Sequence, residues 1–298
     1  MLLAILLASV SSFAQSPSAT SSTETAIEPS LIEKASKHFG ISYYGQATGP
    51  ALSAVNSDVS AIHAADRLGE AQQMNLYNDF RFDYKTGGRY NIRVNARFEI
   101  DPIYDASATS SSGVPISENA NLVNFYNMRV GVVGKLLLPT SGGFNIGSAF
   151  ALELPTSIGS INAGLIAAPR LTLVPHYDVP DSRFGFGAYI IGQSYYYNSY
   201  TAGVNDSLTD FMVYVGPYAN YKLSAKTAAT LQINADTLHK RNKPMDYASY
   251  TPEATNVQLG MNWDVSNNFS INPYVQMFTD YPALNTSLIG AYLSATML

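Results

Sequence analysis

The sequence predicts an all-β protein, a closed antiparallel up-and-down transmembrane β-barrel of about 12 strands. Apolar and polar residues alternate along many long segments, which is typical of strands because successive side chains point to opposite faces. Only 13% of the 298 residues are charged, against about 25% in soluble domains. Long and short connections also follow one another in turn along the chain, as in a barrel with two different rims.

The clearest strand pair lies within residues 73–101. Its second strand carries one wholly apolar face, formed by Tyr90, Ile92, Val94, Ala96, Phe98 and Ile100. A connection with two adjacent glycines joins the strands, and glycine tolerates the positive φ of a tight hairpin. We expect Tyr84 to pair with Tyr90, which places Arg81 opposite Arg93.

The strands around this pair show the same alternation. Residues 39–48 form the first predicted strand. Residues 122–138 form the fourth, in which Val130 and Val132 alternate with polar or small residues. Residues 144–153 follow after a short turn, with Phe, Ile and Leu on one face and Asn, Gly, Ala and Glu on the other.

The second half of the chain repeats the pattern. Its seven predicted strands are residues 164–177, 184–197, 211–222, 227–238, 256–265, 269–279 and 287–297. Pro169, Pro217 and Pro273 lie inside three of them and fit the pattern poorly, because each removes a donor from the ladder, which a bulge can absorb. Asn78, in the earlier hairpin, falls on the apolar face and departs from the pattern.

The N-terminus resembles a secretory signal peptide. Residues 1–10 are almost entirely apolar, and the small residues Ser12 and Ala14 suit positions −3 and −1 of a cleavage site. We therefore expect a signal peptide over residues 1–14, a periplasmic linker over 15–36 and the barrel over 37–298.

Composition excludes several classes of function. The chain has no cysteine, so disulfide scaffolds and cysteine chemistry are excluded. Its net charge of −5 argues against a nucleic-acid partner. No metal-ligand cluster or glycine-rich phosphate loop is present in the sequence, so we expect no metal and no cofactor.

Residues 37–298 resemble bacterial outer-membrane β-barrels of the porin-like kind, through this pattern and not through a short motif. The last strand alternates as theirs does, at Ile289, Ala291, Leu293, Ala295 and Met297, although the chain ends in Leu298 and not in the common Phe. The resemblance implies an outer-membrane location, aromatic girdles at both interfaces and a polar lumen. Membrane lipid, lipopolysaccharide and small hydrophilic solutes are then the expected partners.

Charged residues on the polar faces are the predicted lining of the lumen. They are Arg81, Arg89, Arg93, Arg97, Arg129, Lys135, Arg170, Asp79, Asp83, Glu99, Glu153, Asp236 and Asp264. Such charges either set the selectivity of a pore or fill a narrow barrel as an ion-pair network. Arg93 and Arg97 have fewer acids near them in sequence, and we expect them to form a strip that attracts anions.

Three functions follow from this pattern. The first is a porin-like channel for passive diffusion of small hydrophilic solutes, with a mild preference for anions. The second is a closed structural or adhesive barrel that binds a partner through the outer loops 49–71, 102–120 and 239–252. The third is a hydrolase at the rim, centred on His239, although none of the four histidines is followed by Ser two residues later.

Overall fold

The computed structural model describes residues 36–51, 75–100, 123–136, 143–198, 208–241, 243–244, 249–252, 255–279 and 287–298. Residues 36–298 form one compact unit. The predicted signal peptide, the linker up to residue 35 and the loop at 102–120 lie outside the described residues, as does most of the loop at 49–71. Of the loop at 239–252, residues 242 and 245–248 lie outside them. These predictions therefore stay predictions.

Twelve long strands close into an antiparallel barrel, as predicted. They are β1 (Phe39–Ala51), β2 (Asn75–Lys85), β3 (Tyr90–Ile100), β5 (Arg129–Leu136), β6 (Phe144–Glu153), β7 (Leu165–Asp178), β8 (Phe184–Ser194), β10 (Thr209–Lys222), β11 (Thr227–Lys240), β13 (Asn256–Ser266), β14 (Phe269–Phe278) and β15 (Leu288–Thr296). Each pairs with its neighbours along the chain, β1 pairs with β15, and β10 pairs with both β8 and β11. Among the described residues, each of the twelve long strands is therefore paired on both sides, as a lipid environment requires.

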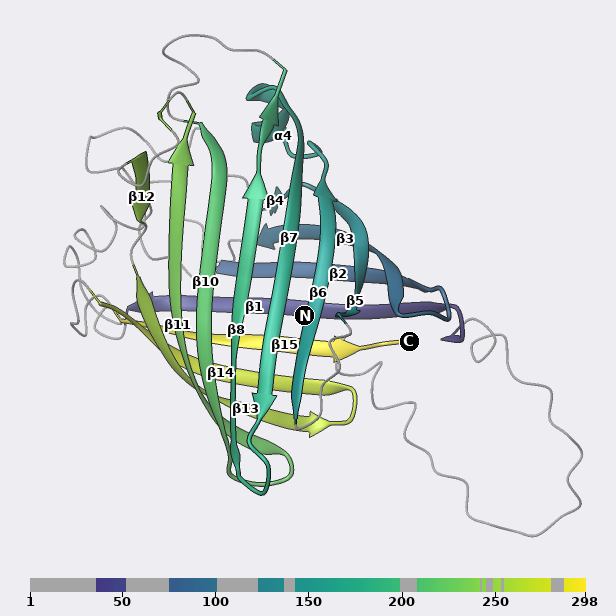
Figure 1. Cartoon of the computed structure of the whole chain (residues 1–298), viewed down its shortest axis with the longest axis vertical. Coiled ribbons are helices and arrows are strands. Elements are labelled where there is room, and N and C mark those ends of the chain that lie inside the picture. The colour runs from purple at the N-terminus through teal and green to yellow at the C-terminus, as the bar shows by residue number, and fades with distance from the viewer. Residues whose placement is uncertain are drawn as a thin grey trace, which may run out of the picture. The chain divides into compact units, whose positions relative to one another are not determined.

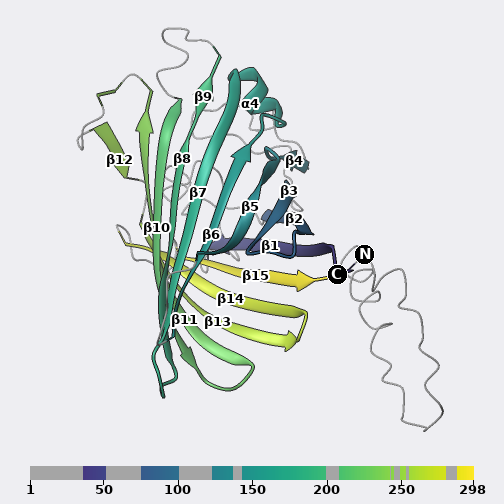
Figure 2. The same ribbon diagram turned by 45° about the vertical axis from the view of Figure 1, so that its right-hand side comes forward.

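The strands are strongly tilted, so those of opposite walls cross. In Figure 1 the strands β6 to β8 run steeply over β1 and β13 to β15, and the turned view in Figure 2 shows the same crossing. The start of β1 and the end of β15 lie at one rim, where the Ile41 N–H donates to the Leu298 carbonyl at 3.3 Å. Short turns follow β2, β7, β10 and β13, whereas longer connections follow β1, β3 and β8.

Several boundaries differ from the prediction. The expected strand 122–138 is two strands, β4 (Val123–Phe125) and β5, with a break at residues 126–128. The expected strand 184–197 likewise divides into β8 and the short β9 (Tyr196–Tyr197). A short β12 (Tyr250–Pro252) and the five-residue helix α4 (Ile158–Asn162) lie in connections. Among the described residues, no helix is long and apolar enough to cross a membrane.

The predicted register of the first hairpin is wrong by two residues. Tyr84 lies opposite Ile92, and Asp83, not Arg81, lies opposite Arg93. The predicted register sets two guanidinium groups against each other, and like charges directly opposite destabilise a strand pair. The observed register replaces that repulsion with an ion pair. Both registers leave the same residues on each face, so the faces were predicted correctly.

The strand prolines are accommodated without bulges. Pro169, Pro217 and Pro273 lie in β7, β10 and β14, and the pairing keeps the same register on both sides of each. No bulge therefore accompanies these three prolines, and the irregularities found between described strands lie near strand ends, as between Thr209 and Phe211. Each proline removes a single donor, and the two flanking ladders hold the strand in place.

The outer face of the barrel is apolar. Large side chains such as Phe82, Phe150, Leu171, Leu231 and Leu259 are exposed on it while their sequence neighbours point inward. Aromatic rings gather at the rim where short turns join neighbouring strands, called here the short-turn rim. The ring centres of Phe39 and Tyr84 lie 5.6 Å apart there, and those of Phe184 and Tyr221 lie 4.8 Å apart. An apolar belt edged by aromatic rings on a closed barrel is the signature of an outer-membrane protein. The chain is such a barrel, and it resides in the outer membrane.

Asn78, the polar residue on the apolar face, is satisfied locally. Its side-chain oxygen accepts a hydrogen bond from the Tyr43 hydroxyl at 2.8 Å, and its amide donates to the Leu76 carbonyl at 2.8 Å. A neighbouring tyrosine thus removes the cost of placing an amide at the lipid face.

Candidate functional site

The inward face of the barrel divides into two kinds of wall. Strands β2, β3, β5 and β6 carry charged side chains that meet in ion pairs, and β7 adds Arg170 beside them. Strands β8, β10, β11, β13, β14 and β15 carry tyrosines and side-chain amides around a cavity. We call these the charged wall and the tyrosine–amide wall.

In the part of the charged wall nearer the turn between β2 and β3, each arginine pairs with one aspartate. Arg93 donates two hydrogen bonds to Asp83, at 2.7 and 2.8 Å, in a bidentate pair. Arg81 donates to Asp79 at 2.9 Å, and Asp79 also accepts from Asn95 at 2.8 Å. The expectation that Arg93 has few acids near it is therefore wrong, because Asp83 lies directly opposite in the observed register.

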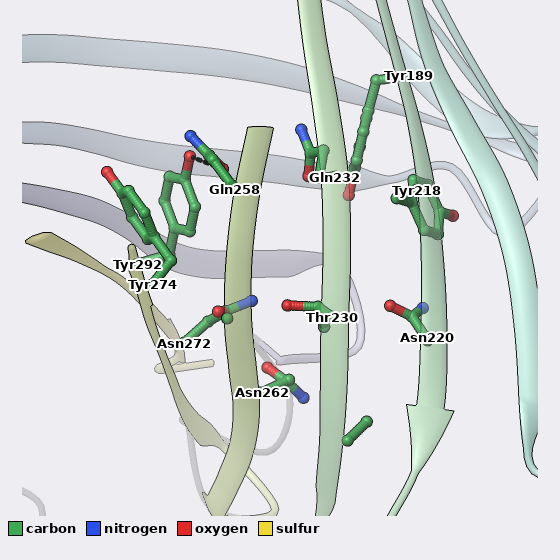
Figure 3. A pocket seen from close by; sticks show the side chains of 12 residues that line it. Tyr189, Tyr218, Asn220, Thr230, Gln232, Gln258, Asn262, Asn272, Tyr274 and Tyr292 are labelled. Carbon is green, nitrogen blue, oxygen red and sulfur yellow. Dashed lines mark hydrogen bonds between the residues drawn. The ribbon is translucent and has the colours of Figure 1, made fainter. Parts of the chain in front are cut away.

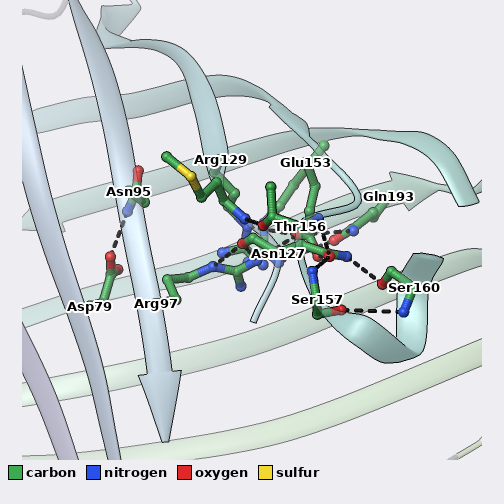
Figure 4. Close-up of polar contacts among 12 residues, drawn as sticks. Asp79, Asn95, Arg97, Asn127, Arg129, Glu153, Thr156, Ser157, Ser160 and Gln193 are labelled. Atoms are coloured by element: carbon green, nitrogen blue, oxygen red, sulfur yellow. Dashed lines mark hydrogen bonds and ion pairs between the residues drawn. The ribbon is translucent and has the colours of Figure 1, made fainter. Parts of the chain in front are cut away.

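In the part of the charged wall nearer the connection between β6 and β7, the charged side chains gather around one carboxylate. Glu153, at the end of β6, accepts from Arg129 at 2.8 Å and lies 3.0 Å from Arg97, two contacts that Figure 4 places side by side. Gln193 of β8 also approaches Glu153, at 3.4 Å, and its side-chain oxygen accepts from Arg170 at 3.3 Å. We call these five residues the Glu153 cluster.

The Glu153 cluster has more positive than negative charge. Arg97 and Arg129 share the single carboxylate of Glu153, and Arg170 contacts the neutral amide of Gln193. Within the cluster, three guanidinium groups therefore face one carboxylate; Asp79, which lies opposite Arg97, is paired with Arg81. Arg93 is therefore not part of the expected anion-attracting strip. Arg97 remains part of it, and Arg129 and Arg170 lie beside Arg97.

A buried asparagine ties the cluster to the rim. Asn127 lies in the break between β4 and β5, and its side-chain oxygen accepts from the backbone N–H groups of Thr156 (3.1 Å) and Ser157 (3.0 Å). Its amide donates to Ser160 at 2.7 Å, and Ser157 caps α4, as Figure 4 shows. The connection between β6 and β7 is thereby held beside the cluster, where a cavity of about 260 Å³ opens. Asn127 was not among the predicted site residues, because nothing in the sequence distinguishes it from the many other amides on the polar faces of the strands.

The tyrosine–amide wall is hollowed by a cavity of about 250 Å³. Tyr189 and Tyr218 lie on one side of it and Tyr274 and Tyr292 on the other, as seen in Figure 3. Amide and hydroxyl side chains, with Thr230 at the centre, form the floor between them. These residues were missed by the sequence analysis, which searched the lumen for charges. The alternation does place Tyr218, Asn220 and Gln258 on the polar faces, but it does not show which of these side chains line one cavity.

Hydrogen bonds fix the rings and amides of this wall. Tyr274 and Tyr292 are stacked with centres 4.7 Å apart. The Tyr274 hydroxyl accepts from Gln46 at 2.8 Å, and the Tyr292 hydroxyl donates to Gln258 at 3.0 Å. Gln258 in turn donates to Gln276 at 2.7 Å. The wall is thus ordered before any solute arrives.

The remaining predicted lining residues are scattered. Arg89 lies in the exposed turn between β2 and β3 and not on a strand. Glu99 accepts from the Tyr126 hydroxyl, and Asp264 accepts from Asn262 at 3.3 Å near the short-turn rim. Asp236 lies in β11. Lys135 lies in β5, but its side chain is outside the described residues.

His239, the residue of the hydrolase hypothesis, is fully buried. Its Nδ1 lies 2.6 Å from an Asp210 carboxylate oxygen, and its Nε2 lies 3.0 Å from the Pro244 carbonyl. Both ring nitrogens thus have partners within the protein, and the ring packs on Tyr250. This geometry is that of a structural histidine, which fastens the connection after β11 to β10.

Comparison with known proteins finds likeness in structure alone. No family model matches the chain, and no curated protein matches it by sequence. An outer membrane channel from Pseudomonas putida F1 is similar with a TM-score of 0.52 and 10% identity, over 87% of this chain and 94% of that chain. The NanC porin gives a TM-score of 0.48 and 7% identity, over 87% of this chain and 100% of that chain. The first likeness confirms that this chain has the fold of a porin-like outer-membrane β-barrel, with no specific family assigned.

Proposed function

We propose that the protein is an outer-membrane pore through which small hydrophilic solutes diffuse passively. The observation that carries this proposal is a closed barrel whose inward face is polar and hollowed, with cavities of about 250 and 260 Å³ in its walls. A barrel with only a structural role would be more stable without these polar cavities, because side chains that line unfilled space lose packing contacts. A barrel of about eight strands is filled by side chains and one of sixteen is open, so twelve strands leave room beside such walls.

We further propose a mild preference for anions, set by the Glu153 cluster. Arg97, Arg129 and Arg170 against Glu153 leave an excess of two positive charges at one level of the wall. Lumen charges that face the solute path set ion selectivity in pores. The pairs Arg93–Asp83 and Arg81–Asp79 add little to the preference, because each is neutral as a unit.

The first test is the conductance of the refolded protein in planar bilayers under a salt gradient. We expect steady channels whose reversal potential indicates anion preference. Arg170→Gln should reduce the anion-to-cation permeability ratio about twofold in about 0.1 M salt. One charge about 8 Å from a passing ion in water is worth roughly 0.5 kcal/mol, with opposite sign for an anion and a cation, and the salt screens this by about half.

The matched control for this variant is Arg89→Gln, which removes the same charge from an exposed turn outside the lumen wall. We expect its permeability ratio to equal that of the unmodified protein. Well-folded barrels that never conduct would refute the pore. Conducting barrels whose selectivity is the same with and without Arg170 would refute the role of the cluster.

A further inference from the structure

We propose that the cavity of the tyrosine–amide wall is a binding subsite for one uncharged sugar ring. This inference rests on the proposed pore, because it names the class of solute that the pore would favour. It concerns the cavity lined by Tyr189, Tyr218, Thr230, Asn272, Tyr274 and Tyr292, among others.

The first argument is the shape of the cavity. Aromatic rings from β8 and β10 flank it on one side, and stacked rings from β14 and β15 flank it on the other (Figure 3). The volume of about 250 Å³ equals that of about eight water molecules, enough for a six-membered sugar ring. Tyr189 is 40% exposed, so its ring is open to a solute.

The second argument is the chemistry of the floor. Among the described residues that line the cavity, none is charged, and the polar members are amides and hydroxyls, which offer both donors and acceptors. A sugar hydroxyl is itself both donor and acceptor, so it satisfies such groups without the desolvation cost of a charge. The C–H faces of a sugar ring are apolar and pack on tyrosine rings, as apolar groups do on aromatic faces.

The third argument is an oxygen of the floor that lacks a partner. Asn272 Oδ1 is buried and has no hydrogen-bond partner among the described residues. It lies beside Gly260, where an added Cβ would be 2.7 Å from this oxygen and 3.0 Å from the Thr230 hydroxyl. This oxygen lies next to the Thr230 hydroxyl, beneath the cavity surface at Gly260, and accepts from a bound donor once the Asn272 side chain turns toward the cavity. A sugar hydroxyl is such a donor.

The charged wall supports the choice of an uncharged ring. Ionic solutes find their partners at the Glu153 cluster, which lies on β3, β5, β6 and β7 with Gln193 of β8, and not in this cavity. An ion placed in the tyrosine–amide cavity has no counter-charge there and loses part of its hydration.

The test is block of the ion current by maltose in planar bilayers. We expect maltose to reduce the current of the unmodified channel in a saturable manner, and polyethylene glycol of similar mass to cause no saturable block. Tyr189→Leu should raise the half-blocking concentration about three- to tenfold, because a ring contact is lost. Thr230→Val, which keeps the shape and removes the hydroxyl, should raise it about threefold.

The control is Tyr221→Leu, which removes a tyrosine from the outer face near the short-turn rim. We expect this variant to show the maltose block of the unmodified channel. Equal half-blocking concentrations in Tyr189→Leu and the unmodified channel would overturn the proposal. So would selective block by glucuronate that depends on Arg170 and not on Tyr189, because the site would then be the charged wall.

Calorimetric titration of maltose into the folded protein in detergent separates this inference from the pore. If no channel conducts but maltose binds and Tyr189→Leu weakens binding, the pore is refuted and the subsite stands. If channels conduct but maltose neither blocks them nor gives a binding signal, the subsite is refuted and the pore stands.

Discussion

At the scale of single residues, Asn127 shows how one side chain organises a rim. It is only 6% exposed and makes four side-chain hydrogen bonds, to two backbone N–H groups, to Ser160 and to Glu153. An amide provides donors and acceptors together, so it joins the start of α4 to the carboxylate that binds Arg97 and Arg129. A carboxylate at this position would add repulsion to Glu153, and an apolar residue would leave the N–H groups unpaired.

We therefore predict that Asn127→Ala destabilises the barrel and loosens the connection after β6. The expected loss is about 2–4 kcal/mol of the free energy of unfolding, because several buried groups lose their partners. Urea unfolding of the protein in lipid vesicles measures it. Asn145→Ala, at an exposed position in β6, is the control and should change stability by less than about 0.5 kcal/mol. Equal effects of the two substitutions would contradict the role of Asn127.

At the scale of elements, the tyrosine–amide wall depends on glycines in neighbouring strands. The hydroxyl end of the Tyr218 ring of β10 lies over Gly187 of β8, and that of the Tyr274 ring of β14 lies over Gly290 of β15, so both side chains lie across the neighbouring strand. A Cβ at either glycine would overlap the ring, so glycine gives each ring its place against the wall. Side chains that lie across the neighbouring strand leave the lumen open, whereas upright ones would narrow it.

We predict that Gly187→Ala destabilises the barrel by about 1–3 kcal/mol, because the new methyl group overlaps the Tyr218 ring and lies 2.6 Å from the Pro175 carbonyl. It should also lower the single-channel conductance, because Tyr218 must turn into the lumen. The control lies in the same strand: a Cβ at Gly192 meets only the Phe211 ring, at 4.0 Å. Gly192→Ala should leave conductance and stability unchanged. A Gly187→Ala channel that conducts normally would refute the argument about the Tyr218 ring.

At the scale of the whole molecule, the sequence was sufficient for the architecture but not for the contacts of the lumen. A period of two determines which residues face lipid, so the number of long strands and both faces were predicted from alternation alone. Register depends on which side chains meet, and alternation is the same for registers two residues apart, which explains the error at Arg93. The partners in the lumen come from distant strands: Glu153 binds Arg97 across 56 positions, and the cavity takes one to three residues from each of six strands. No local sequence pattern predicts such contacts between side chains of distant strands.

Closure of the barrel is the feature of the whole molecule on which every lumen contact depends. It brings the first strand to the last, with Ala47 of β1 opposite Ala291 of β15. The chain has no cysteine, so a designed disulfide has no competing thiol. Because directly opposite residues have Cβ atoms about 4.5–5.5 Å apart, we predict that Ala47→Cys/Ala291→Cys forms a disulfide in the folded barrel.

This disulfide closes a loop of about 240 residues and should stabilise the protein by up to about 5 kcal/mol relative to its reduced form. Mobility on a non-reducing gel after heating measures both its formation and the resistance to unfolding. The control pair is Ala47→Cys/Leu293→Cys, which is out of register by two residues because Leu293 lies opposite Gly45. If the control pair oxidises as readily as the first, the register between β1 and β15 is wrong. If neither pair oxidises in a folded protein, the two strands do not meet and the barrel is open.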